Sequence, residues 1–84
     1  MLRDTILILE NEEDNRKKLA EIFRDEYKVL EVSNEKEGIE LLRAHAASLA
    51  VILVNLMIPA KNNFQVLQRL SEKKYLKQIP FIML

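Results

Sequence analysis

Short, almost purely apolar runs are the feature that most constrains the fold of this chain. Residues 6–9 and 51–54 contain only isoleucine, leucine and valine, and residues 81–84 are phenylalanine, isoleucine, methionine and leucine. A strand with one face in water alternates apolar and polar residues, whereas a strand covered on both faces has a continuous apolar run. These runs therefore predict buried strands of a parallel sheet. Pro80, which is tolerated at the start of a strand, precedes the last of them.

The segments between these runs have apolar residues at helical spacing. They predict a helix that ends near residue 24, a second helix that begins at Asn34 and Glu37 in a capping-box pattern, and a third over residues 64–73. A further short strand is expected over residues 28–33. Strands that alternate with helices and short loops imply right-handed crossovers and helices on both faces of the sheet. The fold class is therefore α/β, a doubly wound parallel sheet.

The loop after the first strand distinguishes among the nucleotide-binding folds of this class. Rossmann and P-loop sites need glycines there, so that the backbone can approach a phosphate closely. Here the loop reads Glu10, Asn11, Glu12, Glu13, and the single glycine of the chain, Gly38, falls inside the second predicted helix. The sequence therefore gives poor support to dinucleotide or nucleoside triphosphate binding. The acidic residues 10–14 also fit a solvated helix start, which the helix dipole favours.

Composition narrows the function classes further. Eighty-four residues make one domain at most, which we place at residues 1–84. Thirteen basic residues balance thirteen acidic residues, which leaves no basic field for nucleic acid or anionic lipid. The chain has no cysteine, a single histidine (His45) and no apolar run approaching the roughly 20 residues of a membrane span. We expect a cytoplasmic protein without a nucleic-acid or membrane partner, whose metal ligands, if any, are oxygen atoms.

Three motifs in order along the chain resemble the receiver domain of response regulators. They are the acidic residues that begin at Glu10, the strand end at Asn55 followed by a turn with Met57 and Pro59, and the apolar residues 79–84. The resemblance covers the whole chain and implies a flavodoxin-like sheet with strand order 2-1-3-4. It also implies an incomplete receiver, because the last two helices and the fifth strand of the family would follow Leu84.

In that family, an acidic pair after the first strand and an acceptor aspartate after the third supply three carboxylates for magnesium binding and phosphoryl transfer. The resemblance places Glu10, Asn11 and Asn55 at these positions, so their formal charge falls from about minus three to minus one. An amide has no ionisable oxygen, so Asn55 cannot form the acyl phosphate. The backbone carbonyl of Met57 falls where the family has a metal ligand. We therefore expect no catalytic residue, and no cofactor beyond weakly bound magnesium.

The resulting interpretation is a degenerate receiver, not an enzyme, that acts in signal transduction through contacts with a protein partner or an output domain. Two alternatives stay open: a phosphotransfer-competent receiver that has been truncated or had its acceptor changed, and an assembly element completed by another chain. In the expected strand order, residues 81–84 form an edge strand without protecting charges or bulges. We therefore expect a homo-oligomer, or a sheet completed by an additional chain.

Overall fold

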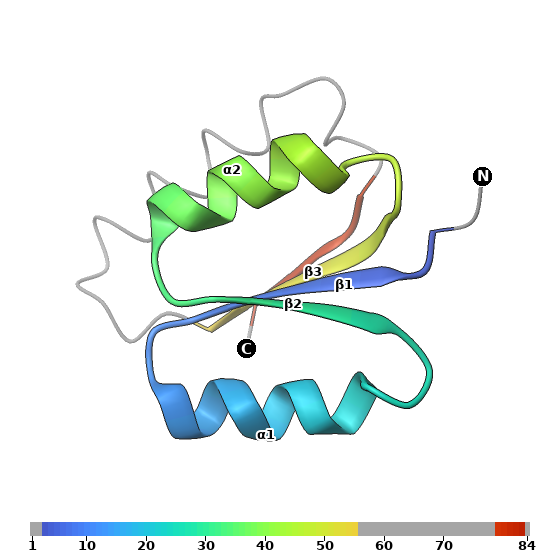
Figure 1. Cartoon of the computed structure of the whole chain (residues 1–84). Helices are drawn as coiled ribbons and strands as arrows, with labels where there is room; N and C mark the ends of the chain where they lie inside the picture. The colour runs from blue at the N-terminus through green and yellow to red at the C-terminus, as the bar shows by residue number, and fades with distance from the viewer. Residues whose placement is uncertain (1–2, 56–78, 84) are drawn as a thin grey trace.

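The computed structural model describes residues 3–55 and 79–83, which form four strands and two helices (Figure 1). In chain order these are β1 (Thr5–Glu10), α1 (Glu13–Phe23), β2 (Lys28–Val32), α2 (Glu35–His45), β3 (Leu49–Asn55) and β4 (Phe81–Met83). The bounds of each of these strands and helices lie within a residue or two of those predicted from the sequence. The third predicted helix, at residues 64–73, lies outside the described residues.

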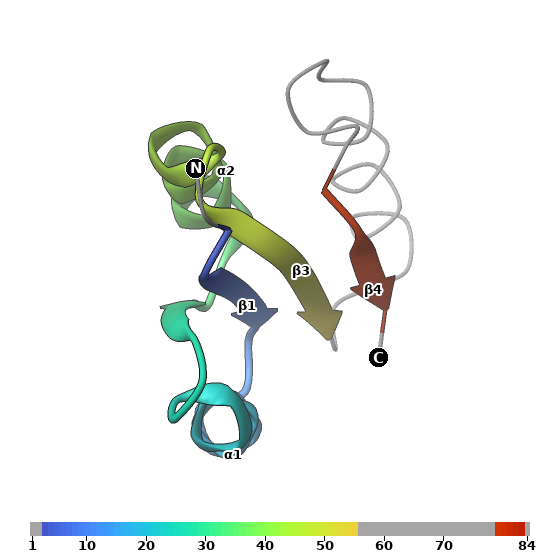
Figure 2. The same ribbon diagram turned by 90° about the vertical axis from the view of Figure 1, so that its right-hand side faces the viewer.

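The four strands form one parallel sheet with the order β2-β1-β3-β4, which confirms the predicted topology. In the register of β1, Leu9 lies opposite Val32 of β2 on one side and Val54 of β3 on the other. Figure 2 shows β1, β3 and β4 side by side and pointing the same way. Because the strands share one direction, their carboxyl ends meet at one edge of the sheet, where ligand sites of open α/β sheets lie.

A helix lies on each face of the sheet, α2 on one and α1 on the other (Figure 1). This arrangement explains the continuous apolar run of β1, because all six of its residues are buried. Its side chains alternate between the faces: Leu7 and Leu9 belong to the larger cluster, on the α2 side, and Ile6 and Ile8 to the cluster under α1. The doubly wound α/β class is therefore confirmed.

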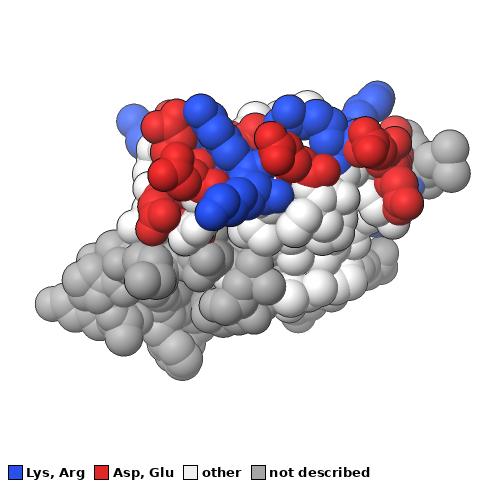
Figure 3. All heavy atoms as spheres, turned by 90° about the horizontal axis from the view of Figure 1, so that it is seen from below, with Lys and Arg blue, Asp and Glu red and all other residues white. Residues whose placement is uncertain are grey.

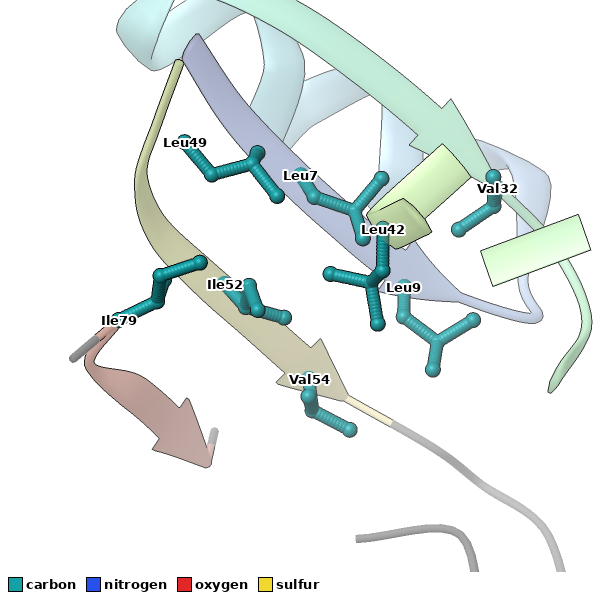
Figure 4. Packing of buried hydrophobic residues seen from close by; sticks show 8 residues of the cluster. All are labelled: Leu7, Leu9, Val32, Leu42, Leu49, Ile52, Val54 and Ile79. Carbon is teal, nitrogen blue, oxygen red and sulfur yellow. The ribbon is translucent and has the colours of Figure 1, made fainter. Parts of the chain in front are cut away.

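The larger cluster joins α2 to every strand or its flank (Figure 4). Leu42, from α2, lies over the sheet and is almost fully buried, and Ile79, just before β4, closes the far side. Its buried members are Leu7, Leu9, Val32, Leu42, Leu49, Ile52, Val54 and Ile79. Burial of such side chains is the main source of stability in a domain this small.

The two helices begin in different ways. At α2, Oδ1 of Asn34 accepts a hydrogen bond from the backbone N–H of Glu37 at 2.9 Å, which satisfies one of the free donors of the helix start. At α1, the N-cap residue Glu12 makes no side-chain cap bond, and Glu13 and Asp14 place negative charge in the first turn. In the part of the chain that the structure describes, neither helix is long and apolar enough to span a membrane.

Candidate functional site

The candidate site lies where β1 and β3 end side by side. In their parallel register, Glu10 at the end of β1 is opposite Asn55 at the end of β3. The structure therefore brings two of the predicted positions together at the carboxyl edge of the sheet, and Asn11 follows Glu10 directly. The side chain of Asn55 and the whole of Met57 lie outside the described residues.

Glu10 is the unusual residue of this edge, because it is fully buried, with 0% of its surface exposed. Its Oε2 accepts a hydrogen bond from the backbone N–H of Glu12 at 3.0 Å, so the carboxylate reaches toward the start of α1. A buried carboxylate is costly unless it is hydrogen-bonded, and this bond meets part of that need. The expectation of a solvated acidic helix start is confirmed for Glu13 and Asp14, which are exposed, but is wrong for Glu10.

Arg16 of α1 also binds at this edge, a contact that the sequence does not predict. Its Nη1 donates a hydrogen bond to the backbone carbonyl oxygen of Glu10 at 2.9 Å. Its Nε lies 3.6 Å from Oε1 of Glu31 in β2. The sequence carries no signal for this contact, because a basic residue on an amphipathic helix is ordinarily expected in solvent. Arg16 therefore connects the end of β1 to Glu31, near the end of β2.

The donor atoms at this edge fit a magnesium site poorly. Magnesium is a hard cation that is held mainly by carboxylates and phosphates. Of the three positions 10, 11 and 55, only Glu10 carries a carboxylate, and the other two are asparagines. Among residues 3–55 and 79–83, no group of three or more His, Cys, Asp or Glu side chains is placed to hold a metal ion. These three positions therefore offer a single carboxylate as a magnesium ligand.

The surface over α1 carries charges of both signs (Figure 3). Lys17 Nζ lies 3.2 Å from Oε1 of Glu13 one turn earlier, and Arg24 Nη2 lies 3.3 Å from Oε2 of Glu31. Seen from this side, basic and acidic side chains are intermingled. This face therefore lacks the single-sign field that attracts nucleic acid.

Comparisons with known protein families and solved structures show which proteins this chain resembles. The family model described as the response regulator receiver domain matches residues 6–84. Among solved structures, the chain is similar to the chemotaxis response regulator CheY4 of Vibrio cholerae, with a TM-score of 0.77 and 20% sequence identity. The match covers 95% of this chain and spans 66% of the length of that one, and at this identity it concerns the fold alone. A search of curated proteins gives no match.

Proposed function

Because the chain belongs to the response regulator receiver domain family, we propose that it is a degenerate receiver, which signals through protein contacts and is not switched by aspartyl phosphorylation. The family places the chain in two-component signalling, where receiver domains are in general signalling modules without enzymatic activity of their own. The proposal adds that residues 1–84 are one receiver-like domain whose phosphoacceptor position is lost.

The register between β1 and β3 is the observation that carries this proposal. It puts Asn55, at the end of β3, beside Glu10 at the end of β1. The proposal takes Asn55 as the counterpart of the acceptor aspartate of the family. Formation of an acyl phosphate needs a carboxylate nucleophile and a divalent cation that neutralises the phosphoryl oxygens. Asn55 has no ionisable oxygen, and Asn11 removes a second carboxylate. In this proposal Asn55 is structural, and Glu10, Asn11 and Met57 mark a metal site that is weak or lost.

The partners that follow from the proposal are proteins. Receiver domains interact with kinases and with output domains, and this chain belongs to their family. Charges of both signs lie over α1, and complementary charges across an interface between two proteins set its specificity. We therefore propose signalling in the cytoplasm, with no direct contact to nucleic acid or membrane.

Incubation with magnesium and beryllofluoride, a phosphoryl mimic, tests the proposal. We expect no change in the amide NMR signals of the residues that follow Leu9 and Val54, and no added mass after treatment with a small phosphodonor. A chain with both Asn11→Asp and Asn55→Asp is the matched control, because it restores the two missing carboxylates at the same strand ends. A stable phosphoryl adduct on the unchanged chain, found by mass spectrometry at this site, would contradict the proposal.

The position of β4 favours a second candidate function. In this alternative, the chain is an assembly element that another chain completes. Within the described residues, β4 is the last strand of the sheet, and its Ile82 is 45% exposed. An apolar strand at the end of a sheet can pair with a strand of another molecule. Sedimentation equilibrium at micromolar concentration tests this candidate: self-association supports it, and a monomer at every concentration counts against it.

A further inference from the structure

Residues 10–16 form a closed ring of hydrogen bonds where β1 turns into α1. The Glu10 carboxylate accepts from the Glu12 N–H at 3.0 Å, the Glu12 carbonyl accepts from the Arg16 N–H at 2.9 Å, and the Glu10 carbonyl accepts from Arg16 Nη1 at 2.9 Å. Arg16 therefore contributes to the ring through both its backbone and its side chain. We call residues 10–12 the β1–α1 turn.

The Arg16 side chain is much more shielded from solvent than the other basic groups in the ion pairs near it. It is 17% exposed, compared with 60% for Arg24 and 64% for Lys17. Water competes less for the bonds of a shielded group, so these bonds are worth more than those of an exposed pair. Glu31 holds Arg16 from the side of β2, with its Oε1 3.6 Å from Arg16 Nε, while its Oε2 pairs with Arg24. The guanidinium is therefore fixed from two directions.

We propose that Arg16 is a positioning residue, which holds the β1–α1 turn in one shape and gives this edge of the sheet a positive charge from within the chain. The turn then needs no bound divalent cation to hold Glu10 in place, and its shape is the same with and without magnesium.

This inference rests on the proposed function, because it concerns the same site. It adds that Arg16 regulates the shape of this site. In a switchable receiver, the site must rearrange between two states that differ in what is bound there. A turn fixed by Arg16 through Glu10 and Glu12 is biased toward one of these states. The domain then presents a constant surface to its protein partner.

Amide hydrogen exchange of the full 84-residue chain, followed by NMR, tests the inference. In Arg16→Gln the Glu12 amide should exchange roughly tenfold faster, the equivalent of about 1.4 kcal/mol of local opening, while Ile8 in the middle of β1 should change much less. Arg16→Lys keeps the charge but loses the forked geometry, so its effect should be intermediate. Lys17→Gln, which removes an exposed charge from the same helix, is the control and should leave Glu12 unchanged.

Three results would overturn the inference. Equal acceleration at Glu12 and Ile8 would mean that Arg16 only stabilises the fold as a whole. Unchanged exchange at Glu12 would mean that the ring does not hold the turn. A shift of the Glu12 amide signal when millimolar magnesium is added to the unchanged chain would mean that a cation still shapes the turn.

A second variant keeps the test decisive if Arg16→Gln does not fold. Glu31→Gln removes the ion pair on the β2 side and leaves the bond to the Glu10 carbonyl in place, so Glu12 should exchange faster by a smaller factor and Ile8 should not. No change at Glu12 in this variant would again count against the inference. A phosphoryl adduct in the beryllofluoride and phosphodonor experiments would refute the proposed function and leave these exchange rates unaffected, so the two failures are distinguishable.

Discussion

Replacing Gly38 by alanine should stabilise the protein, because Gly38 lies inside α2 where there is room for a methyl group. The backbone of Gly38 has no positive φ, so alanine can adopt the same helical conformation. A Cβ atom at this position would lie 3.7 Å from Cδ1 of Leu9 and 3.7 Å from Cγ2 of Val32, which is ordinary van der Waals contact. The new methyl group would therefore pack between α2 and the ends of β1 and β2, next to the candidate site.

The expected gain has two contributions. Alanine is favoured over glycine by about 0.8–1 kcal/mol in a helix interior, largely because glycine loses more conformational freedom on folding. Burial of the methyl group against Leu9 and Val32 adds at most about 0.8 kcal/mol, and small adjustments of these neighbours offset part of it. We expect the free energy of unfolding to rise by about 1 kcal/mol, which corresponds to a rise in melting temperature of about 4–8 °C for a domain of this size.

Thermal and urea unfolding, followed by circular dichroism, measure this gain. Glu40→Ala is the matched control, because Glu40 is exposed on the same helix and glutamate and alanine are both good helix formers. This substitution should change the free energy of unfolding by no more than about 0.5 kcal/mol. Gly38→Leu should instead destabilise the fold by about 1–3 kcal/mol through overpacking. If Gly38→Ala lowered the free energy of unfolding by more than about 0.5 kcal/mol, α2 would have to lie closer to Leu9 and Val32 than the structure places it.

Two further predictions concern the site and β4. Asn55→Asp alone should not restore efficient phosphorylation, because Asn11 still weakens the cation site, whereas the double change with Asn11→Asp should bind magnesium more tightly in an NMR titration. If the single variant were phosphorylated as readily as an ordinary receiver, the role assigned to Asn11 would be wrong. Ile82→Lys should weaken self-association at sedimentation equilibrium, because a charge on β4 opposes strand pairing, and unchanged association would exclude β4 as the contact.

The helices and strands could be predicted because the residue patterns that indicate them are local in sequence. The run at residues 6–9 predicts a strand buried on both faces, and the structure buries Ile6, Leu7, Ile8 and Leu9 between α1 and α2. The capping pattern at Asn34 predicts where α2 begins, because the side chain bonds a backbone group only three residues away. Both signals depend on neighbours in sequence, so one sequence is enough to read them.

The contacts of the site could not be predicted in the same way. The strand order implied by the resemblance to receiver domains predicts that Glu10 and Asn55 end neighbouring strands. The full burial of Glu10 could not be predicted, because Glu10 stands in an acidic run that also fits a solvated helix start. The bond from Arg16 to the Glu10 carbonyl depends on the angle at which α1 leaves β1, and its pair with Glu31 depends on β2 lying beside β1. These are tertiary distances, and no local spacing carries them.

The amides at positions 11 and 55 agree with the burial of Glu10. Two carboxylates about 4 Å apart repel each other by about 4 kcal/mol at an effective dielectric constant of 20, and salt screens a buried pair only weakly. Three such groups at one strand edge persist only if a cation offsets the repulsion or some of them take up protons. With Asn11 and Asn55 in place, Glu10 carries the single carboxylate of these three positions, and Arg16 donates a hydrogen bond from its guanidinium to the Glu10 carbonyl. Under the proposed function, the signal of this domain then depends on when and where its protein partner binds.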